Sequence, residues 1–439
     1  LEISLAGYKP GDFTMVIGFP GMTDRYSSSY EVESRVSNTL PISNKVRGDQ
    51  MAIMREWMNR DPSVRLKYAD SYFSLSNVQE LNEGEVLCCR RFGVAEAKRK
   101  SEEKLQVWID SDPARKEKWG NLLSLASEKY EALGSLERNV TYYRETLIRG
   151  TRFSRIVPKI NILKSDVLKK NGIRPHRVID AGGPCREEVD CCRKFSIWLG
   201  PYQKALKKHY TGGDGKCDYA ALTDSLWKGS FLTSIEKLEK FASEDHSVDE
   251  YLADPMCRFF QDISIRDFND ARARIEGEPD ILELNREYTH AIYQKSLQDG
   301  MAQYPDANST IRISYGTVGD IEPYDGVVCS WRSTSAGILE KYDSSTYEFG
   351  LRKDWKKLLE QGDWGKWWPE SSAIAVDFLT DNDITGGNSG SPVLDAEGRL
   401  IGLAFDGNKE SLASNTYYTP GYNKCVCTDI RFVLFTLDK

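Results

Sequence analysis

The chain has 439 residues, a formal net charge of −7 and a pI near 5.5. This length suits roughly two or three domains, and its 40% hydrophobic content supports globular cores. The acidic balance argues against a nucleic-acid-binding protein, because phosphate recognition needs clustered Lys and Arg, and no apolar run is long enough to span a bilayer.

Ten cysteines occur without the paired C-x-x-C spacing of structural zinc sites, so we expect neither a metal nor a cofactor. Two interpretations of the cysteines stay open. One is a pair of disulfides, or a single one, formed in an oxidising compartment, and the other is a set of buried thiols. The candidates for disulfides are Cys185, Cys191, Cys192 and Cys217.

The chain begins with an apolar run at residues 13–21 that Gly and Pro stop, which predicts a strand ending in a turn. Charged stretches with helical spacing follow until about residue 300. Asp112 and Pro113 are typical of a helix start, and the ranges 232–241 and 281–297 show helical spacing too. One face of the helix after Asp112 collects the apolar residues Trp119, Leu122, Leu123, Ala126, Tyr130 and Leu133.

Basic residues cluster at 88–91 and 98–100 and are followed by acidic ones, which predicts a solvated helix face. Beyond residue 305 the spacing predicts short strands again. We expect them at residues 311–315, 373–379, 400–405 and 431–435. The order of strand, helical block and strands predicts an α+β protein in which a helical insertion interrupts a β domain.

Residues 386–392 read Gly-Gly-Asn-Ser-Gly-Ser-Pro, which is typical of a nucleophilic serine loop. A serine hydroxyl needs a base to take its proton and N–H donors to hold the oxyanion. We predict Ser389 as the nucleophile. The backbone N–H groups of Gly387 and Ser389 would form the oxyanion hole, since glycine permits the turn that this requires.

No partner histidine can be recognised. The sequence has four histidines, and all of them fall within the block with helical spacing, so we assign none as the catalytic base. They are His176, His209, His246 and His290.

Four segments together resemble the bacterial dipeptidyl-peptidase 7 and dipeptidyl-peptidase 11 family of serine exopeptidases. They are residues 9–26, 72–77, 385–408 and 429–435. The third contains the serine loop and the run Gly-Leu-Ala-Phe-Asp-Gly-Asn, and the fourth lies close to where chains of this family end. The resemblance covers nearly the whole sequence, and it implies a serine peptidase that removes dipeptides from the free N-termini of oligopeptides.

The fold that the resemblance implies is a chymotrypsin-type double β-barrel with a large inserted α-helical domain. Residues 1–42 would be the remainder of the first barrel, which is incomplete here. Residues 43–304 would form the inserted helical cap, and residues 305–439 the C-terminal barrel that carries Ser389.

Matches to the family's motifs also imply substrate contacts. Asp406 would pair with the α-ammonium of the substrate, and Asn77 would hydrogen-bond to it. Both residues have a structural alternative, because Asp406-Gly407 is a favoured hairpin turn and Asn77 could be a loop or cap residue. Gly407 stands where the acid-specific branch has arginine, which implies an uncharged pocket and a hydrophobic or broad preference at the residue before the cleaved bond.

The family's triad histidine and aspartate belong upstream of residue 1, so we expect a partial, inactive chain of a periplasmic or secreted enzyme. Two alternatives remain open. One is a non-catalytic remnant that binds peptide N-termini, and the other is a glutamyl-endopeptidase-like protease with the same serine loop. The expected partners are oligopeptides with a free N-terminus and, as among the relatives, a second copy in a homodimer.

Overall fold

The computed structural model describes residues 1–150, 219–234, 236–237, 240–241, 244, 250, 253–260, 273, 281–346, 349–369 and 373–439. The chain divides into two compact units. Unit 1 comprises Leu1–Ser27, Gly84–Arg99 and Tyr293–Lys439, and unit 2 comprises Ser28–Glu83 and Lys100–Ile292. All strands of the described residues belong to unit 1, whereas unit 2 is helical, so the chain has the expected α+β composition.

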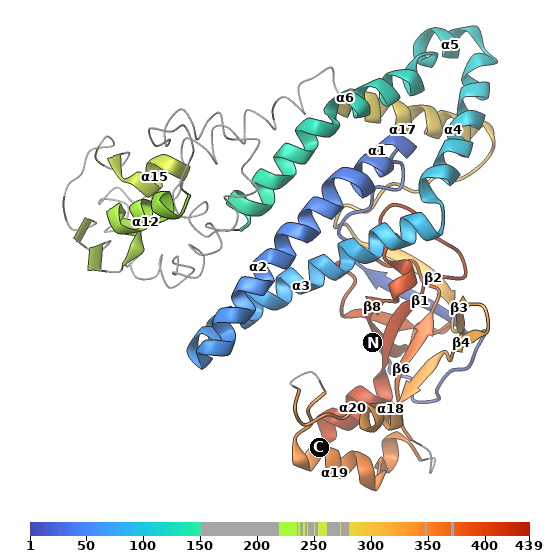
Figure 1. The fold of residues 1–439 in the computed structure, drawn as a ribbon. Coiled ribbons are helices and arrows are strands. Elements are labelled where there is room, and N and C mark those ends of the chain that lie inside the picture. Colours follow the sequence, from blue (N-terminus) through green and yellow to red (C-terminus); the bar gives the residue numbers. More distant parts are fainter. Residues whose placement is uncertain are drawn as a thin grey trace. The chain divides into compact units, whose positions relative to one another are not determined.

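Unit 1 is built on a seven-stranded antiparallel sheet in the order β2-β1-β7-β8-β9-β6-β5 (Figure 1). The strands are β1 (Phe13–Gly18), β2 (Arg312–Thr317), β5 (Arg332–Thr334), β6 (Ala375–Thr380), β7 (Ser391–Leu394), β8 (Leu400–Gly407) and β9 (Cys425–Asp429). A separate hairpin joins β3 (Ile321–Tyr324) to β4 (Val327–Cys329). Four of the sheet strands confirm the strands predicted at residues 13–21, 311–315, 373–379 and 400–405.

The first and sixth strands of this order are also joined. Val318, directly after β2, forms an antiparallel bridge with Thr380 at the end of β6. The N–H of Gly319 donates to Leu379 O (3.2 Å), and the N–H of Asp381 donates to Thr317 O (3.1 Å). The six strands β2, β1, β7, β8, β9 and β6 therefore close into a ring, which covers the edge of β2 and leaves β5 as the edge strand of the sheet. Alternate residues fill its interior: Val16, Val318, Phe378, Val393, Ile401, Ala404, Cys425 and Cys427.

The chain ends in a helix, not in the strand predicted at residues 431–435. Helix α20 (Ile430–Asp438) begins at Asp429, whose carboxylate accepts the N–H of Arg431 (2.8 Å). Phe435 on this helix is fully buried against aromatic residues that include Trp364. The strand prediction was wrong because a short apolar run fits a buried helix and a buried strand equally well.

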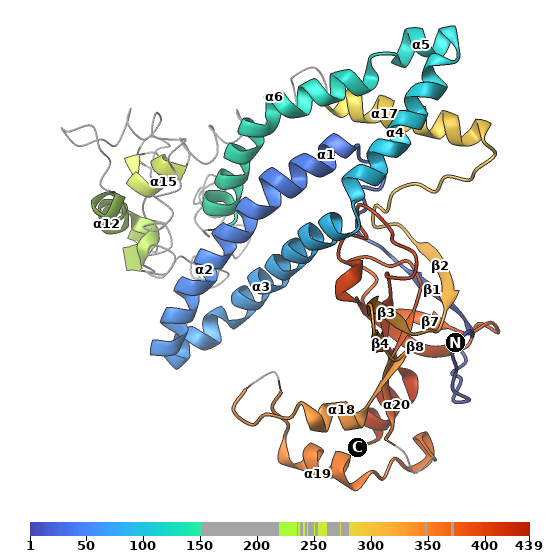
Figure 2. The ribbon, with the colours of Figure 1, turned by 45° about the vertical axis from the view of Figure 1, so that its right-hand side comes forward.

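Helices α18 (Ser335–Glu340) and α19 (Lys353–Gln361) pack near α20 at this end of unit 1 (Figure 2). Asp429 is fully buried there, where it accepts the Tyr8 hydroxyl (2.6 Å) and pairs with Arg431 (2.6 Å). Burial and the Asp429 carboxylate raise the pKa of Tyr8, so its hydroxyl stays a donor. This group ties the start of the chain to its last helix.

Unit 2 consists of helices that pack by apolar faces. Long helices α2 and α6 lie side by side, and α1 also contacts α6 (Figure 1). The longer helices are α2 (Leu40–Arg60), α3 (Pro62–Arg91), α4 (Val94–Asp110), α6 (Leu122–Tyr143), α12 (Tyr219–Gly229) and α17 (Ile281–Gln298), and parts of α3, α4 and α17 belong to unit 1. The shorter ones include α1 (Ser29–Ser34), α5 (Pro113–Trp119) and α15 (Pro255–Phe259).

The predicted helix start at Asp112 is confirmed, because its carboxylate accepts the N–H of Arg115 (2.9 Å) with Pro113 in the first turn. The expected single helix is wrong in one respect, since it breaks between α5 and α6 at Gly120. Its apolar face is nevertheless buried as predicted. Helix α17 confirms the pattern at 281–297, while the pattern at 232–241 opens with a 3-10 turn and partly falls outside the described residues.

The basic runs at residues 88–100 are not a uniformly solvated face. Lys98 is only 8% exposed and donates to Arg25 O (2.8 Å) and Ser27 O (2.7 Å), and Cys88 and Cys89 are buried. Because residues 84–99 belong to unit 1, this part of α3 and α4 buries polar groups that a free helix would expose to water.

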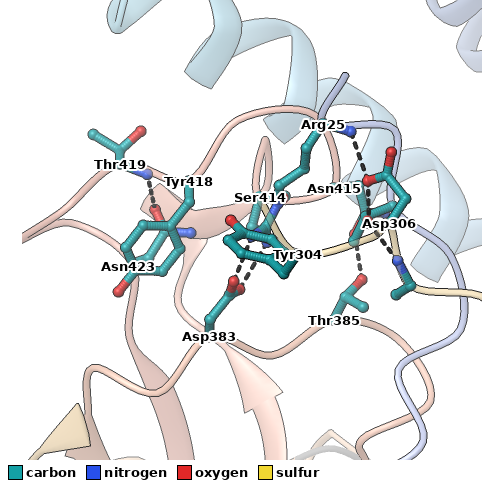
Figure 3. A network of polar contacts seen from close by, with 12 residues as sticks. Arg25, Tyr304, Asp306, Asp383, Thr385, Ser414, Asn415, Tyr418, Thr419 and Asn423 are labelled. Carbon is teal, nitrogen blue, oxygen red and sulfur yellow. Dashed lines mark hydrogen bonds and ion pairs between the residues drawn. The ribbon is translucent and has the colours of Figure 1, made fainter. Parts of the chain in front are cut away.

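An ion pair between a buried arginine and a half-buried aspartate fixes the segments around the end of β1 (Figure 3). The Arg25 side chain is 9% exposed and binds both carboxylate oxygens of Asp383, with one N–H to oxygen distance of 2.7 Å. Its Nε donates to Ser414 O (2.9 Å), and its backbone N–H donates to Asp306 (2.9 Å). Burial opposes the charge of Arg25, yet the Asp383 carboxylate outweighs it and raises the pKa of the guanidinium. Arg25 therefore joins four distant segments of unit 1.

We predict that Arg25→Met lowers the free energy of unfolding by about 2 kcal/mol, because it removes the charged hydrogen bonds to Asp383 and Ser414 O while the alkyl packing persists. Urea denaturation followed by tryptophan fluorescence measures this. Arg352→Met is the matched control, since Arg352 and Asp354 form a pair whose side chains are 73% and 65% exposed. Its expected effect is below about 0.5 kcal/mol, and equal losses in both variants would contradict the assignment.

Tyr418 stacks on Arg25, and burial, then the Asp383 and Asp381 carboxylates, raise its pKa to about 12. Below pH of about 10 the folded and unfolded states both keep this proton, and between about 10 and 12 only the unfolded state loses it. The free energy of unfolding should therefore fall across this window, by at most about 1 kcal/mol per pH unit given the partial exposure of Tyr418. Denaturation curves at several pH values should show a smaller fall in Tyr418→Phe but an unchanged one in Tyr315→Phe, whose residue is 75% exposed.

Candidate active site

The loop that carries Ser389 holds a backbone conformation that requires glycine. Gly387 has φ +107° and Gly390 has φ +84°. A Cβ atom at Gly387 would lie 2.4 Å from Phe19 O, so no other residue fits there. The N–H of Gly21 donates to Gly386 O (2.6 Å) and holds the loop against the segment that follows β1.

The N–H groups of this loop fall into two sets. Those of Asn388, Gly390 and Ser391 donate to Thr385 O (3.1 Å), Ala404 O (2.7 Å) and Asn388 O (2.9 Å), in that order. The N–H groups of Gly387 and Ser389 have no acceptor among the residues that the structure describes, and both residues are exposed. An oxyanion needs N–H donors that are not used elsewhere, and these two lie on either side of Asn388.

The hydroxyl of Ser389 is exposed and donates to Phe405 O on β8 (3.2 Å). At this point β8 contains a bulge. Ala404 pairs with Cys427 on β9, but Asp406 pairs with Val426, so the register shifts by one residue at Phe405. The Ser389 hydroxyl therefore contacts β8 at the residue where the regular pairing of β8 with β9 is interrupted.

The support beneath the loop is closely packed. Asn388 is 4% exposed, and its side chain donates to Thr385 O (3.1 Å). A Cβ atom at Gly18 would lie 2.3 Å from both Asn388 Oδ1 and Ser391 Oγ, so β1 approaches the loop more closely than any side chain would allow. The absence of a side chain at Gly18 was not recognised in the sequence as a requirement of the site.

Asp406 follows Phe405 directly and lies in β8, so the alternative of an Asp406-Gly407 hairpin turn is wrong. Its carboxylate is exposed and accepts the N–H of Gly407 (2.8 Å). No lysine or arginine of the described residues lies within 4 Å of it. At the bulge, the Ser389 hydroxyl thus contacts Phe405, and the next residue of the strand carries the unpaired Asp406 carboxylate.

Gly407 has less space than the sequence indicated. A Cβ atom there would lie 2.6 Å from Ser411 Oγ, which donates to Asn408 O (2.7 Å). Ser411 belongs to the short 3-10 helix Lys409–Ser411 and is mostly buried. Its role could not be found from the sequence, because it depends on how the chain turns back after β8.

Asn77 lies in unit 2, exposed within α3. The alternative of a loop or cap residue is wrong, since the helix extends well beyond it on both sides. Its contact with a substrate stays a prediction.

Unit 1 contains no histidine, because all four in the sequence lie between residues 100 and 292. His290 on α17 packs edge-on against Trp119 and lies 3.7 Å from Glu287, both in unit 2. His176, His209 and His246 lie outside the described residues, as do the four candidate disulfide cysteines. The six described cysteines form no disulfide with one another. Unit 1 therefore contains the serine and its N–H donors but no histidine side chain.

Two further properties bear on the site. Among the described residues, no group of three or more His, Cys, Asp or Glu side chains is arranged to hold a metal ion. Of the helices in the same part of the chain, none is long and apolar enough to cross a membrane.

Comparison with known proteins gives consistent similarities. The chain is 31% identical to Dipeptidyl-peptidase 7 of Porphyromonas endodontalis and 32% identical to that of Porphyromonas gingivalis, in each case over 100% of this chain. It is 29% identical to the Asp/Glu-specific dipeptidyl-peptidase of Capnocytophaga gingivalis. It spans 54%, 62% and 63% of the length of these three proteins.

Among solved structures, the chain is similar to Porphyromonas endodontalis DPP11 in complex with the dipeptide Arg-Asp. The TM-score is 0.84 at 24% sequence identity, and the match covers 100% of this chain and 64% of that one. This likeness establishes the fold.

The model of the family described as Peptidase S46 matches residues 1–182 and 199–439. A match over nearly the whole length identifies the family: the chain belongs to the peptidase S46 family.

Proposed function

We propose that the protein is a serine dipeptidyl aminopeptidase, which releases dipeptides from the free N-termini of oligopeptides. The observation that carries the proposal is the arrangement on β8, where the Ser389 hydroxyl meets Phe405 O and the unpaired Asp406 carboxylate follows directly. A fixed carboxylate close to a nucleophile selects substrates whose ammonium lies close to the cleaved bond. The names of the relatives, dipeptidyl-peptidases, support the same activity.

In the proposed reaction, Ser389 Oγ attacks the carbonyl carbon of the second substrate residue. The two unpaired N–H groups of Gly387 and Ser389 hold the oxyanion that forms. The proton of Ser389 passes to a general base, which then gives it to the leaving amine as the acyl-enzyme forms. This base would be the triad histidine that the resemblance implies, a role that we assign to none of the four histidines of this sequence.

Asp406 would pair with the substrate's α-ammonium, with Asn77 as a second ligand. Gly407 adds no charge to the pocket, and we propose a hydrophobic or broad preference at the residue before the cleaved bond. The ring of six strands would be one barrel of a chymotrypsin-type double barrel. A periplasmic or secreted location and a homodimer complete the proposal.

A second candidate is a peptide-binding protein without catalysis. The lack of histidine in unit 1 favours it, since this unit itself supplies no imidazole to Ser389. Asp406 would then bind peptide N-termini without a following attack. The two candidates differ in turnover and not in binding.

The test uses the protein purified from its natural gene and fluorogenic dipeptidyl substrates with a free or an acetylated N-terminus. We expect release from the free substrate only, and a loss of at least about 10⁴-fold in Ser389→Ala. Asp406→Asn should lower kcat/KM by about 10- to 100-fold, since an ionic hydrogen bond contributes about 1.5–3 kcal/mol.

Asp354→Asn is the matched control, because it removes the same charge at an exposed site in unit 1 and should leave kcat/KM unchanged. Binding of the free substrate without release would favour the peptide-binding protein. Equal release from the acetylated substrate would reject the role of Asp406.

The pocket at Gly407 gives a second prediction. Gly407→Arg should move the preference toward Asp and Glu before the cleaved bond, provided that Ser411 yields the space its hydroxyl occupies. We therefore expect a larger shift in Gly407→Arg combined with Ser411→Ala, where only the obstructing oxygen is removed. The ratio of kcat/KM for substrates ending in Asp and in Leu measures it, with Ser411→Ala alone as the control. An unchanged ratio in the double variant would reject the assignment.

A further inference from the structure

An open cavity of about 510 Å³ lies in unit 1 beside the hairpin of β3 and β4, and neither the serine loop nor Asp406 lines it. This volume is within the range of small-molecule sites, about 300–1,000 Å³. Its charged and aromatic walls are Arg91, Glu322, Tyr324, Asp325 and Tyr422, and Val327 and Val328 complete it.

The turn and the strand alternation of the hairpin place its acidic residues on the side of the cavity. Tyr324 pairs with Val327, so Asp325 and Gly326 form a two-residue turn, with Gly326 at φ +73°. Along β3 the buried residues alternate with exposed ones, which puts Glu322 and Tyr324 on one face. Glu322 and Asp325 thus border the same cavity, and neither has an ion pair within 4 Å among the described residues.

Arg91, at the end of α3, lines the cavity and packs directly on the hairpin. Its guanidinium lies 4.3 Å from the ring centre of Tyr324 and 5.4 Å from that of Tyr422, and it donates one hydrogen bond to Pro323 O. Stacking fixes the plane of the guanidinium, and most of its N–H donors have no acceptor among the described residues. Charges of both signs therefore line one cavity without neutralising each other.

We infer that this cavity is a second binding site, for short peptides whose two termini are free. A planar guanidinium with unused donors binds a carboxylate through two parallel hydrogen bonds, which suits a peptide's C-terminus. Glu322 and Asp325 suit its ammonium, and the tyrosine rings and Val327 suit apolar side chains. A ligand with a single charge would leave one wall unpaired.

The cavity is connected to the strand that carries Asp406. Asn408, which follows Gly407, donates through its side chain to Tyr422 O (2.8 Å), so one residue contacts both the cavity wall and the end of β8. Binding at this cavity does not require that the protein hydrolyse peptides. Under the proposed function, however, the released dipeptides belong to the class that the cavity binds.

The test measures binding of the dipeptide Val-Leu by calorimetry to the protein from its natural gene. The Asp406→Ala background removes the proposed ammonium contact at the serine site. We expect binding to persist there and its Kd to rise at least about tenfold in Arg91→Gln. Amidation of the peptide's C-terminus should weaken binding to the same extent, and Asp325→Asn should weaken it less.

Lys409→Gln is the matched control, because the Lys409 ammonium also lies over Tyr324 (5.7 Å) but does not line the cavity. It removes the same charge and should leave Kd within twofold. Loss of all binding in Asp406→Ala would overturn the inference, as would residual binding that Arg91→Gln leaves unchanged. Failure of the proposed hydrolysis is measured separately, since this readout needs no turnover.

Discussion

The ion pair between Arg25 and Asp383 is the contact on which the geometry of unit 1 depends. Asp383 precedes the serine loop, and Arg25 follows the segment that the loop touches, so the pair sets the distance between the two. Ion pairs in which one partner is buried contribute little net stability, because desolvation of that partner opposes their attraction. Such a pair instead fixes geometry. Only one arrangement of the Arg25 side chain allows contacts with Asp383, Ser414 O and the Tyr418 ring together.

That constraint explains why the candidate site can rely on backbone groups. Gly18 and Gly387 allow close contacts that tolerate no side chain, and such contacts hold only if the strands around them cannot drift. The ring closure through Val318 and Thr380 provides this rigidity from one side, and Arg25 provides it from the other. N–H donors held without a partner are useful only when the backbone that carries them is fixed.

The sequence indicated those parts of this arrangement that depend on local chemistry. The serine loop needs glycine at defined positions, Asp112 is a local cap, and the runs that form β1, β2, β6 and β8 are rich in strand-forming residues, so each was predictable. Helix α20 was not, because a short apolar run of β-branched and aromatic residues fits a buried strand as well as a buried helix. The contacts of Arg25 with Asp383, of Gly407 with Ser411 and of Lys98 with Ser27 join distant residues, and no local pattern marks them. The substrate roles of Asp406 and Asn77 came from resemblance and not from residue chemistry.

The bulge at Phe405 has an evolutionary consequence. Without the extra residue, position 406 would face Cys425, whose side chain points into the ring, and a carboxylate would enter an apolar core. With it, Gly407 takes that place, and Asp406 turns outward. Amino-acid substitutions alone cannot change which of these two positions faces the interior of the ring. Deletion of a single codon in this strand can, so the gene would lose its candidate ammonium-binding residue through a change in length even if the codon for that aspartate stayed intact.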